Sequence, residues 1–154
     1  MKTAWMGMLF LVLSAAGQTP DSNDLNLLQG RWTASSIEVQ GRRLIQSEVE
    51  KLQFLFEAKG SQVTFGPADM RREATLRLDG SRTPRTIDFR LKAEADKPQV
   101  TLLGIYKIEG DTLTLCVPAN PDIPARPTEF RSDPAAGTTL VVLQRVKPDA
   151  PPQR

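Results

Sequence analysis

The stretch LLGIYKIEGDTLTLCV, residues 102–117, decides the fold because it contains two alternating runs joined by Gly110-Asp111. Glycine reaches positive φ at little cost, so a Gly-Asp step between such runs predicts a tight β-hairpin turn. A one-residue slip would exchange the two faces, so the pattern also predicts the register. The expected pairs are Ile108–Leu113, Tyr106–Leu115 and Gly104–Val117. The expected core face is Leu102, Gly104, Tyr106, Ile108, Leu113, Leu115 and Val117.

The same alternation recurs along the chain and predicts an antiparallel all-β domain. Ser47-Glu48-Val49-Glu50 is typical of a capping box and predicts one short helix over residues 48–52. Closure of a sheet of this size removes its exposed edges. We therefore expect a small antiparallel up-and-down β-barrel of about eight strands with one short helix. The further expected strands cover residues 30–40, 53–57, 63–65, 73–79, 85–91 and 138–145.

The two ends of the chain differ in composition from the rest. Residues 1–17 combine Lys2, an apolar run and a small-residue Ala15-Ala16-Gly17 ending, which predicts a cleaved secretory signal peptide rather than the alternative of an uncleaved anchor. Residues 18–24 are expected to be a flexible lead, residues 25–146 the barrel domain and residues 147–154 a disordered, proline-rich tail. The predicted location is periplasmic or extracellular, with no membrane span after cleavage.

Composition argues against several chemistries. The chain has no histidine, which excludes a Ser-His-Asp triad and the usual histidine-containing zinc sites. Its single cysteine, Cys116, cannot form an internal disulfide. The formal charge is +2, and the pairs Arg42-Arg43 and Arg71-Arg72 are separated and have acidic neighbours, so we expect solvated surface and no nucleic-acid partner. No cofactor and no metal are predicted.

A set of spaced motifs resembles a known family. Gly-x-Trp at the start of the first strand, with an arginine late in the last strand, is similar to the lipocalin-like superfamily, and the whole set resembles an uncharacterised family of exported lipocalin-like domains abundant in planctomycete bacteria. The resemblance implies a barrel in which Trp32 plugs one end and Arg145 packs over its ring, but it implies no activity. The matching motifs are Leu28-Gln29-Gly30-x-Trp32, Gly104-Ile105-Tyr106, Gly110-Asp111-Thr112-Leu113, Cys116, Arg126-Pro127-Thr128-Glu129-Phe130 and Leu143-x-Arg145.

Physical reasoning supports a structural role for Gly30, Trp32 and Arg145. A guanidinium over an indole contributes about 0.5–2 kcal/mol. The contact would also join the first strand to the last, as a closed barrel requires.

Several residues are candidates for a ligand site. Tyr106, Phe89 and Phe56 fall on the expected inner face, where they either line a pocket or fill the barrel. Arg126 and Glu129 follow a segment, Pro118 to Pro127, whose four prolines predict an extended loop. They either anchor a ligand headgroup or form an ion pair that fixes the loop.

Cys116 and the outward carboxylates are candidates for chemistry that we expect to have structural roles instead. Cys116 is expected opposite Ile105 in an apolar setting, which favours an inert thiol over a reactive one. Glu73, Asp79 and Asp88 are expected on outward strand positions with arginines nearby, which favours charge pairing over glycoside chemistry.

These observations favour a noncatalytic exported domain. The first hypothesis is an apolar or amphipathic small molecule held inside the barrel. The alternative is a protein-interaction or cell-envelope module with a filled barrel, whose partner is an envelope protein.

Overall fold

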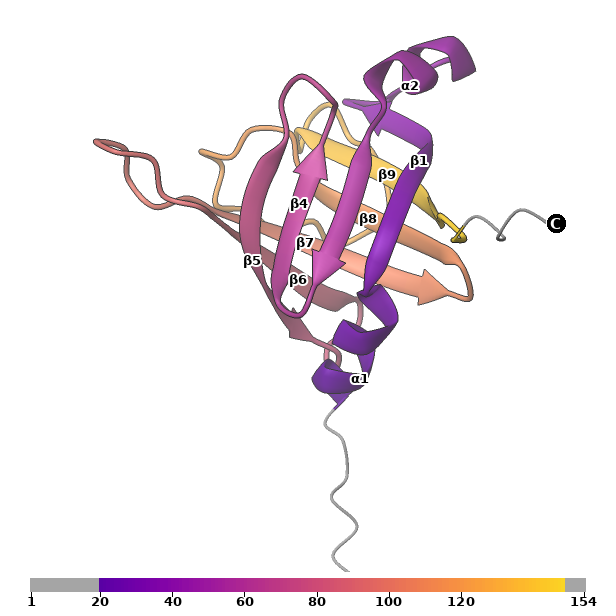
Figure 1. The fold of residues 1–154 in the computed structure, drawn as a ribbon. Helices are drawn as coiled ribbons and strands as arrows, with labels where there is room; N and C mark the ends of the chain where they lie inside the picture. The colour runs from indigo at the N-terminus through magenta and orange to yellow at the C-terminus, as the bar shows by residue number, and fades with distance from the viewer. Residues whose placement is uncertain (1–19, 149–154) are drawn as a thin grey trace, which may run out of the picture.

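The computed structural model describes residues 20–148 and consists mostly of strands (Figure 1). The elements are α1 (Pro20–Leu28), β1 (Gly30–Val39), β2 (Arg42–Arg43), α2 (Gln46–Leu52), β3 (Leu55–Lys59), β4 (Gln62–Gly66), β5 (Arg72–Asp79), β6 (Arg85–Leu91), β7 (Thr101–Glu109), β8 (Thr112–Pro118) and β9 (Thr138–Arg145). The predicted signal peptide, residues 1–17, lies outside the described residues, as does the tail beyond Pro148.

Eight of these strands form a closed antiparallel barrel, which confirms the predicted fold class. From β3 to β9 each strand pairs with the next, while β1 pairs with both β3 and β9 and so closes the ring. The closing ladder runs from Trp32 opposite Arg145 to Val39 opposite Thr139, with a bulge between Ala34 and Ser36. The two-residue β2 pairs only with the end of β1 and stays outside the ring.

The β7–β8 hairpin has the predicted register. Ile108 faces Leu113, Tyr106 faces Leu115 and Ile105 faces Cys116. The ladder ends at this last pair, so the expected Gly104–Val117 pair lies beyond it. Close contact persists there nonetheless, because a Cβ on Gly104 would lie 2.9 Å from Val117 Cγ1.

The N-terminal segment corrects one prediction. Residues 20–24, expected to be a flexible lead, belong to the nine-residue helix α1. Tertiary contacts hold this helix, since Leu28 and Asp24 are buried and the Trp32 indole donates a 3.0 Å hydrogen bond to the Leu28 carbonyl. Only one side of the helix contacts the barrel, so most of its residues are polar and the sequence resembles that of a linker.

The expected short helix is present as α2, but it begins earlier than predicted. Its N-cap is Ile45, whose backbone N–H donates to Glu48 Oε2 at 3.0 Å. This bond, together with Arg42, lowers the pKa of Glu48. The acidic half of the capping box is therefore Glu48 rather than Glu50, which instead accepts a hydrogen bond from the Gln46 side chain.

A long connection between β8 and β9, residues 119–137, forms a strap over the outer side of the β7–β8 hairpin. The Cys116 thiol contacts the Arg131 carbonyl at 3.5 Å, and Lys107 lies 5.2 Å from the Phe130 ring. Ile105 and Cys116 are therefore buried although they point away from the barrel interior. Pro118 ends β8 opposite Thr138 instead of opening the loop, which a strand end tolerates.

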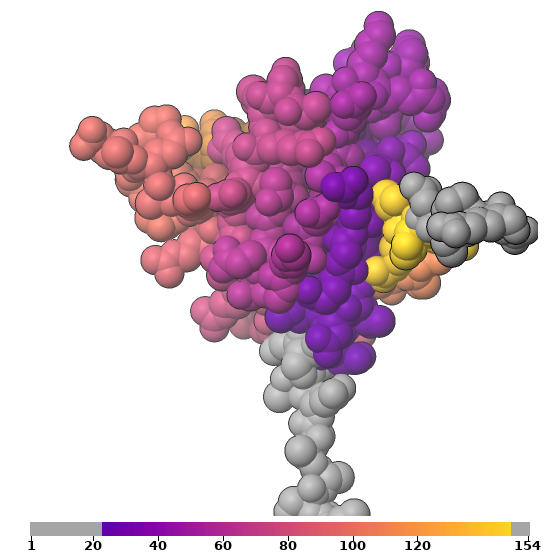
Figure 2. Space-filling view, in the orientation of Figure 1, coloured from indigo at the N-terminus to yellow at the C-terminus, as the bar shows by residue number. Residues whose placement is uncertain are grey.

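The remaining long connection lies between β6 and β7. It projects from one edge of the barrel, as the space-filling view also shows (Figure 2). Among residues 20–148, no helix has both the length and the apolar composition needed to cross a membrane.

Candidate functional site

The α1 end of the barrel is closed by Trp32 and Arg145. The Arg145 guanidinium lies 4.1 Å from the centre of the indole ring. Arg145 also donates to the carbonyls of Leu27 at 2.7 Å and Gln29 at 2.9 Å, and it pairs with Asp111 at 3.1 Å. One side chain thus contacts the last turn of α1, the first strand and the β7–β8 turn.

The barrel interior contains a buried polar contact just above this closure. The Tyr106 hydroxyl donates to Asp24 Oδ2 at 2.6 Å, and Arg85 lies 2.9 Å from the same oxygen. Asp24 is only 4% exposed, so its charge is compensated by one cation and one hydroxyl. The polar tip of Tyr106, predicted to meet a ligand, meets helix α1.

The predicted aromatic ligand contacts pack against each other. Phe56 and Phe89 are buried and meet edge to face with ring centres 6.4 Å apart. Phe65 packs on Phe89 at 4.9 Å. These rings occupy the middle of the barrel, and Trp32 and Tyr106 fill the end nearest α1.

The inner side is less completely covered towards α2. Phe54, Phe65 and Val100 are only partly buried there, as is Leu52 of α2 itself. This apolar rim is the part of the interior that a small molecule could reach.

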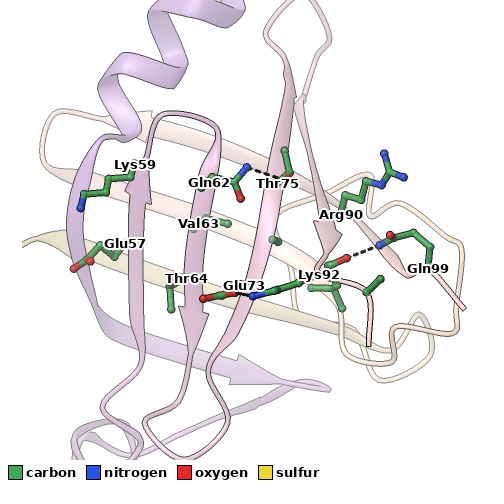
Figure 3. A pocket seen from close by; sticks show the side chains of 13 residues that line it. Glu57, Lys59, Gln62, Val63, Thr64, Glu73, Thr75, Arg90, Lys92 and Gln99 are labelled. Atoms are coloured by element: carbon green, nitrogen blue, oxygen red, sulfur yellow. Dashed lines mark hydrogen bonds and ion pairs between the residues drawn. The ribbon is translucent and has the colours of Figure 1, made fainter. Parts of the chain in front are cut away.

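A groove of about 570 Å³ crosses the outer face of β3 to β6 (Figure 3). Polar side chains from four adjacent strands point into it, while Val63, Ala74 and Leu91 supply its floor. Its polar lining consists of Glu57, Lys59, Gln62, Thr64, Glu73, Thr75, Arg90, Lys92 and Gln99.

A second groove of about 550 Å³ continues the first beneath the projecting β6–β7 connection. The two share Thr64, Glu73, Leu91, Lys92 and Ala93, and together we call them the basic groove. It carries six cationic side chains and three carboxylates. The cations are Lys59, Arg71, Arg72, Arg90, Lys92 and Lys97, and the carboxylates are Glu57, Glu73 and Glu94.

Ion pairing neutralises only part of this charge. Lys92 pairs with Glu73 at 2.6 Å, which raises the pKa of the lysine, and the Lys97 pair lowers the pKa of Glu94. The Glu57 carboxylate pairs with Arg31 from outside the groove. Lys59, Arg71 and Arg90 therefore add cationic charge that no ion pair within residues 20–148 compensates.

The pairs Arg42-Arg43 and Arg71-Arg72 have different environments in the structure. Arg42 pairs with Glu48 on α2, and Arg43 pairs with Glu38 on β1. Residues 71 and 72 instead join the cations of the basic groove. Sequence spacing cannot indicate this gathering, because residues 59, 71–72, 90–92 and 97 become neighbours only through strand pairing.

Arg126 and Glu129 lie on the strap but do not pair with each other. Arg126 donates to the Gly104 carbonyl at 2.7 Å and lies 2.7 Å from Asp88 Oδ1. Glu129 is exposed and lies 4.0 Å from Arg131. The loop-fixing role considered for the pair thus falls to Arg126 alone, with Asp88 as its acidic partner.

Cys116 is completely buried beneath the strap. Desolvation raises the pKa of its thiol, and the contacts to Arg131 and Thr138 offset this only partly. Both effects of burial, low access and low thiolate content, reduce reactivity.

Within residues 20–148, no group of three histidine, cysteine or acidic side chains could hold a metal ion. Comparison of the chain with family models, with curated proteins and with solved structures gives no match. The function is therefore inferred from the geometry of the barrel and its surfaces.

Proposed function

We propose that this protein is a noncatalytic, exported, lipocalin-like barrel that acts as a protein-interaction module of the cell envelope. In this proposal the barrel interior is scaffold, and the basic groove binds an acidic segment of a partner protein. The observation that carries it is the filled interior: Phe56 and Phe89 contact each other, and the Tyr106 hydroxyl is already bonded to Asp24.

The chemistry of the partner follows from the charges of the basic groove. Six cations against three carboxylates favour an acidic surface, and such complementarity raises association rates and excludes basic partners. The lining lacks aromatic side chains, so stacking on bases, which single-stranded nucleic acids use, has no platform in it.

Titration with a short poly-glutamate peptide tests the proposal, because the peptide presents the expected charge without a defined fold. We expect saturable binding by calorimetry that weakens as salt rises. Replacing Arg71 and Arg72 by glutamine should weaken binding about fivefold to tenfold, since each exposed ion pair contributes up to about 1 kcal/mol.

The matched control replaces Arg42 and Arg43 by glutamine. It removes the same formal charge from arginines that are already ion-paired. Equal weakening by the two double variants would mean that the peptide senses net charge alone, and absence of binding to the unchanged protein would refute the basic groove as a docking site.

The partly buried apolar rim near α2 supports a second candidate, an apolar small molecule inside the barrel. Native mass spectrometry of the purified protein distinguishes the two. A reproducible bound molecule that is released by Phe89→Ala and weakened by Phe65→Ala would favour the interior site. Empty spectra together with peptide binding would favour the interaction module.

A further inference from the structure

A separate pocket of about 540 Å³ lies where the strap meets the outer face of β5 and β6. We call it the strap pocket. Only Leu78 among its lining residues is apolar, so it does not suit an apolar ligand. The other lining residues are Arg77, Asp79, Arg82, Thr86, Asp88 and Arg126.

Arg126 is positioned in this pocket by the β-sheet. Its guanidinium donates to the Gly104 carbonyl and lies 2.7 Å from Asp88 Oδ1, although that carboxylate oxygen receives no well-aligned hydrogen bond. The side chain is 29% exposed. A guanidinium has five N–H donors, so these contacts leave donors available on a group whose position is already set.

The carboxylate of Asp79 is committed to the β5–β6 turn. It accepts the Ser81 hydroxyl and backbone N–H at 2.5 and 3.1 Å, and it pairs with Arg82 at 3.2 Å. The two serine hydrogen bonds hold the pKa of Asp79 below its usual range. Asp79 therefore stays ionised and is matched by Arg82 alone.

Arg77 provides the uncompensated charge. It lies opposite Asp88 in the β5–β6 register and is exposed. Its guanidinium makes no ion pair or hydrogen bond within residues 20–148, since the Asp88 carboxylate is engaged by Arg126. Three guanidinium groups against two carboxylates leave the pocket with one net positive charge.

We propose that the strap pocket binds an oxyanion group, a phosphate or a carboxylate, carried on a small polar molecule. Arg77 supplies the free guanidinium, which matches such groups by paired hydrogen bonds. Arg126 supplies a second donor set held in place by β7, and the Thr86 hydroxyl offers a neutral donor on the pocket wall. Ligand binding here would involve the strap as well as the barrel.

The test titrates the protein with inorganic phosphate and, in parallel, with citrate at constant ionic strength, followed by backbone and arginine Nε–H NMR signals. We expect saturable shifts at Thr86, Asp88 and Arg126. Arg77→Gln should weaken binding about tenfold, in line with the loss of charge-assisted hydrogen bonds. Saturation by phosphate alone, by citrate alone or by both would support the site and identify the oxyanion class.

The control is Arg90→Gln. Arg90 is also an outward, exposed arginine of this sheet, but it lines the basic groove and not the strap pocket. The Arg90→Gln substitution should leave phosphate and citrate binding unchanged. Shifts that grow without saturation, or equal loss in the two variants, would overturn the proposal, because both results indicate general charge attraction.

The experiment is independent of the poly-glutamate titration. Arg77→Gln should leave peptide binding intact, while the double change at Arg71 and Arg72 should leave phosphate binding intact. Thermal melts of each variant establish that it remains folded. Either proposal can therefore fail without affecting the other.

Discussion

Replacement of Arg145 by methionine tests the closure of the barrel most directly. The change keeps an unbranched side chain of similar reach but removes the charge over Trp32 and the hydrogen bonds to the Leu27 and Gln29 carbonyls. The cation–π contact is worth about 0.5–2 kcal/mol. Each hydrogen bond from a charged donor adds about 1.5–3 kcal/mol when buried.

These values need a discount because the Arg145 side chain is 27% exposed. Water reaches part of the guanidinium and replaces some of the lost hydrogen bonding. We expect a net loss of about 3 kcal/mol in the free energy of unfolding. For a domain of this size the loss corresponds to a melting temperature lower by about 10 °C.

Urea unfolding and thermal melts followed by circular dichroism measure the effect. Arg31→Met is the matched control, because Arg31 lies next to Trp32, the residue opposite Arg145, but its side chain forms only an exposed pair with Glu57, worth at most about 1 kcal/mol. Hydrogen exchange adds a second readout: amides of α1 should lose protection in the Arg145 variant. A loss no larger than that of the control would refute the role assigned to Arg145.

Further predictions concern the β7–β8 hairpin. Gly104→Ala should destabilise the fold by about 2 kcal/mol, since the new Cβ would meet Val117 Cγ1 at 2.9 Å and the Cys116 carbonyl at 3.0 Å. A Cβ on Gly110 would have no atom within 4 Å, so Gly110→Ala should lower the free energy of unfolding by only about 1 kcal/mol, from the positive φ alone. A larger loss for Gly110→Ala than for Gly104→Ala in urea unfolding would contradict the close packing of Gly104. The Cys116 thiol should react slowly with a disulfide reagent in the native protein and rapidly in urea. Because burial raises its folded pKa, this thiol should also make stability fall as pH rises above the ordinary thiol pKa; rapid native labelling would contradict the burial.

Local pattern explains why the strands and their pairing could be predicted. Each hairpin joins segments adjacent in sequence, so the period-2 alternation and a glycine turn suffice to align them. Leu76 opposite Phe89 and Tyr106 opposite Leu115 follow this rule. Closure was predicted from the general need of a sheet this size and from the expected contact of Arg145 with Trp32, and the structure supplies the full pairing of β1 with β9.

Side-chain environments that depend on distant segments were not predictable in the same way. The helix α1 looks polar in isolation, yet Asp24 is bonded to Tyr106, which is 82 positions away in the sequence. The ion pair considered for Arg126 and Glu129 does not form, because the strap brings Arg126 to Asp88 on β6. Nearness in sequence was the wrong criterion for a loop that crosses three strands.

The sequence by itself determined which residues form the strands of the barrel, how the hairpin of residues 102–117 is aligned and which side of it is apolar, because these properties depend on neighbours in the chain. Only the tertiary structure decided what the two faces of residues 102–117 contact. Closure placed Tyr106 against Asp24 inside the barrel, and the strap buried Cys116 outside it. Strand pairing likewise gathered the cations of the basic groove, since side chains on adjacent strands become neighbours whatever their separation in sequence.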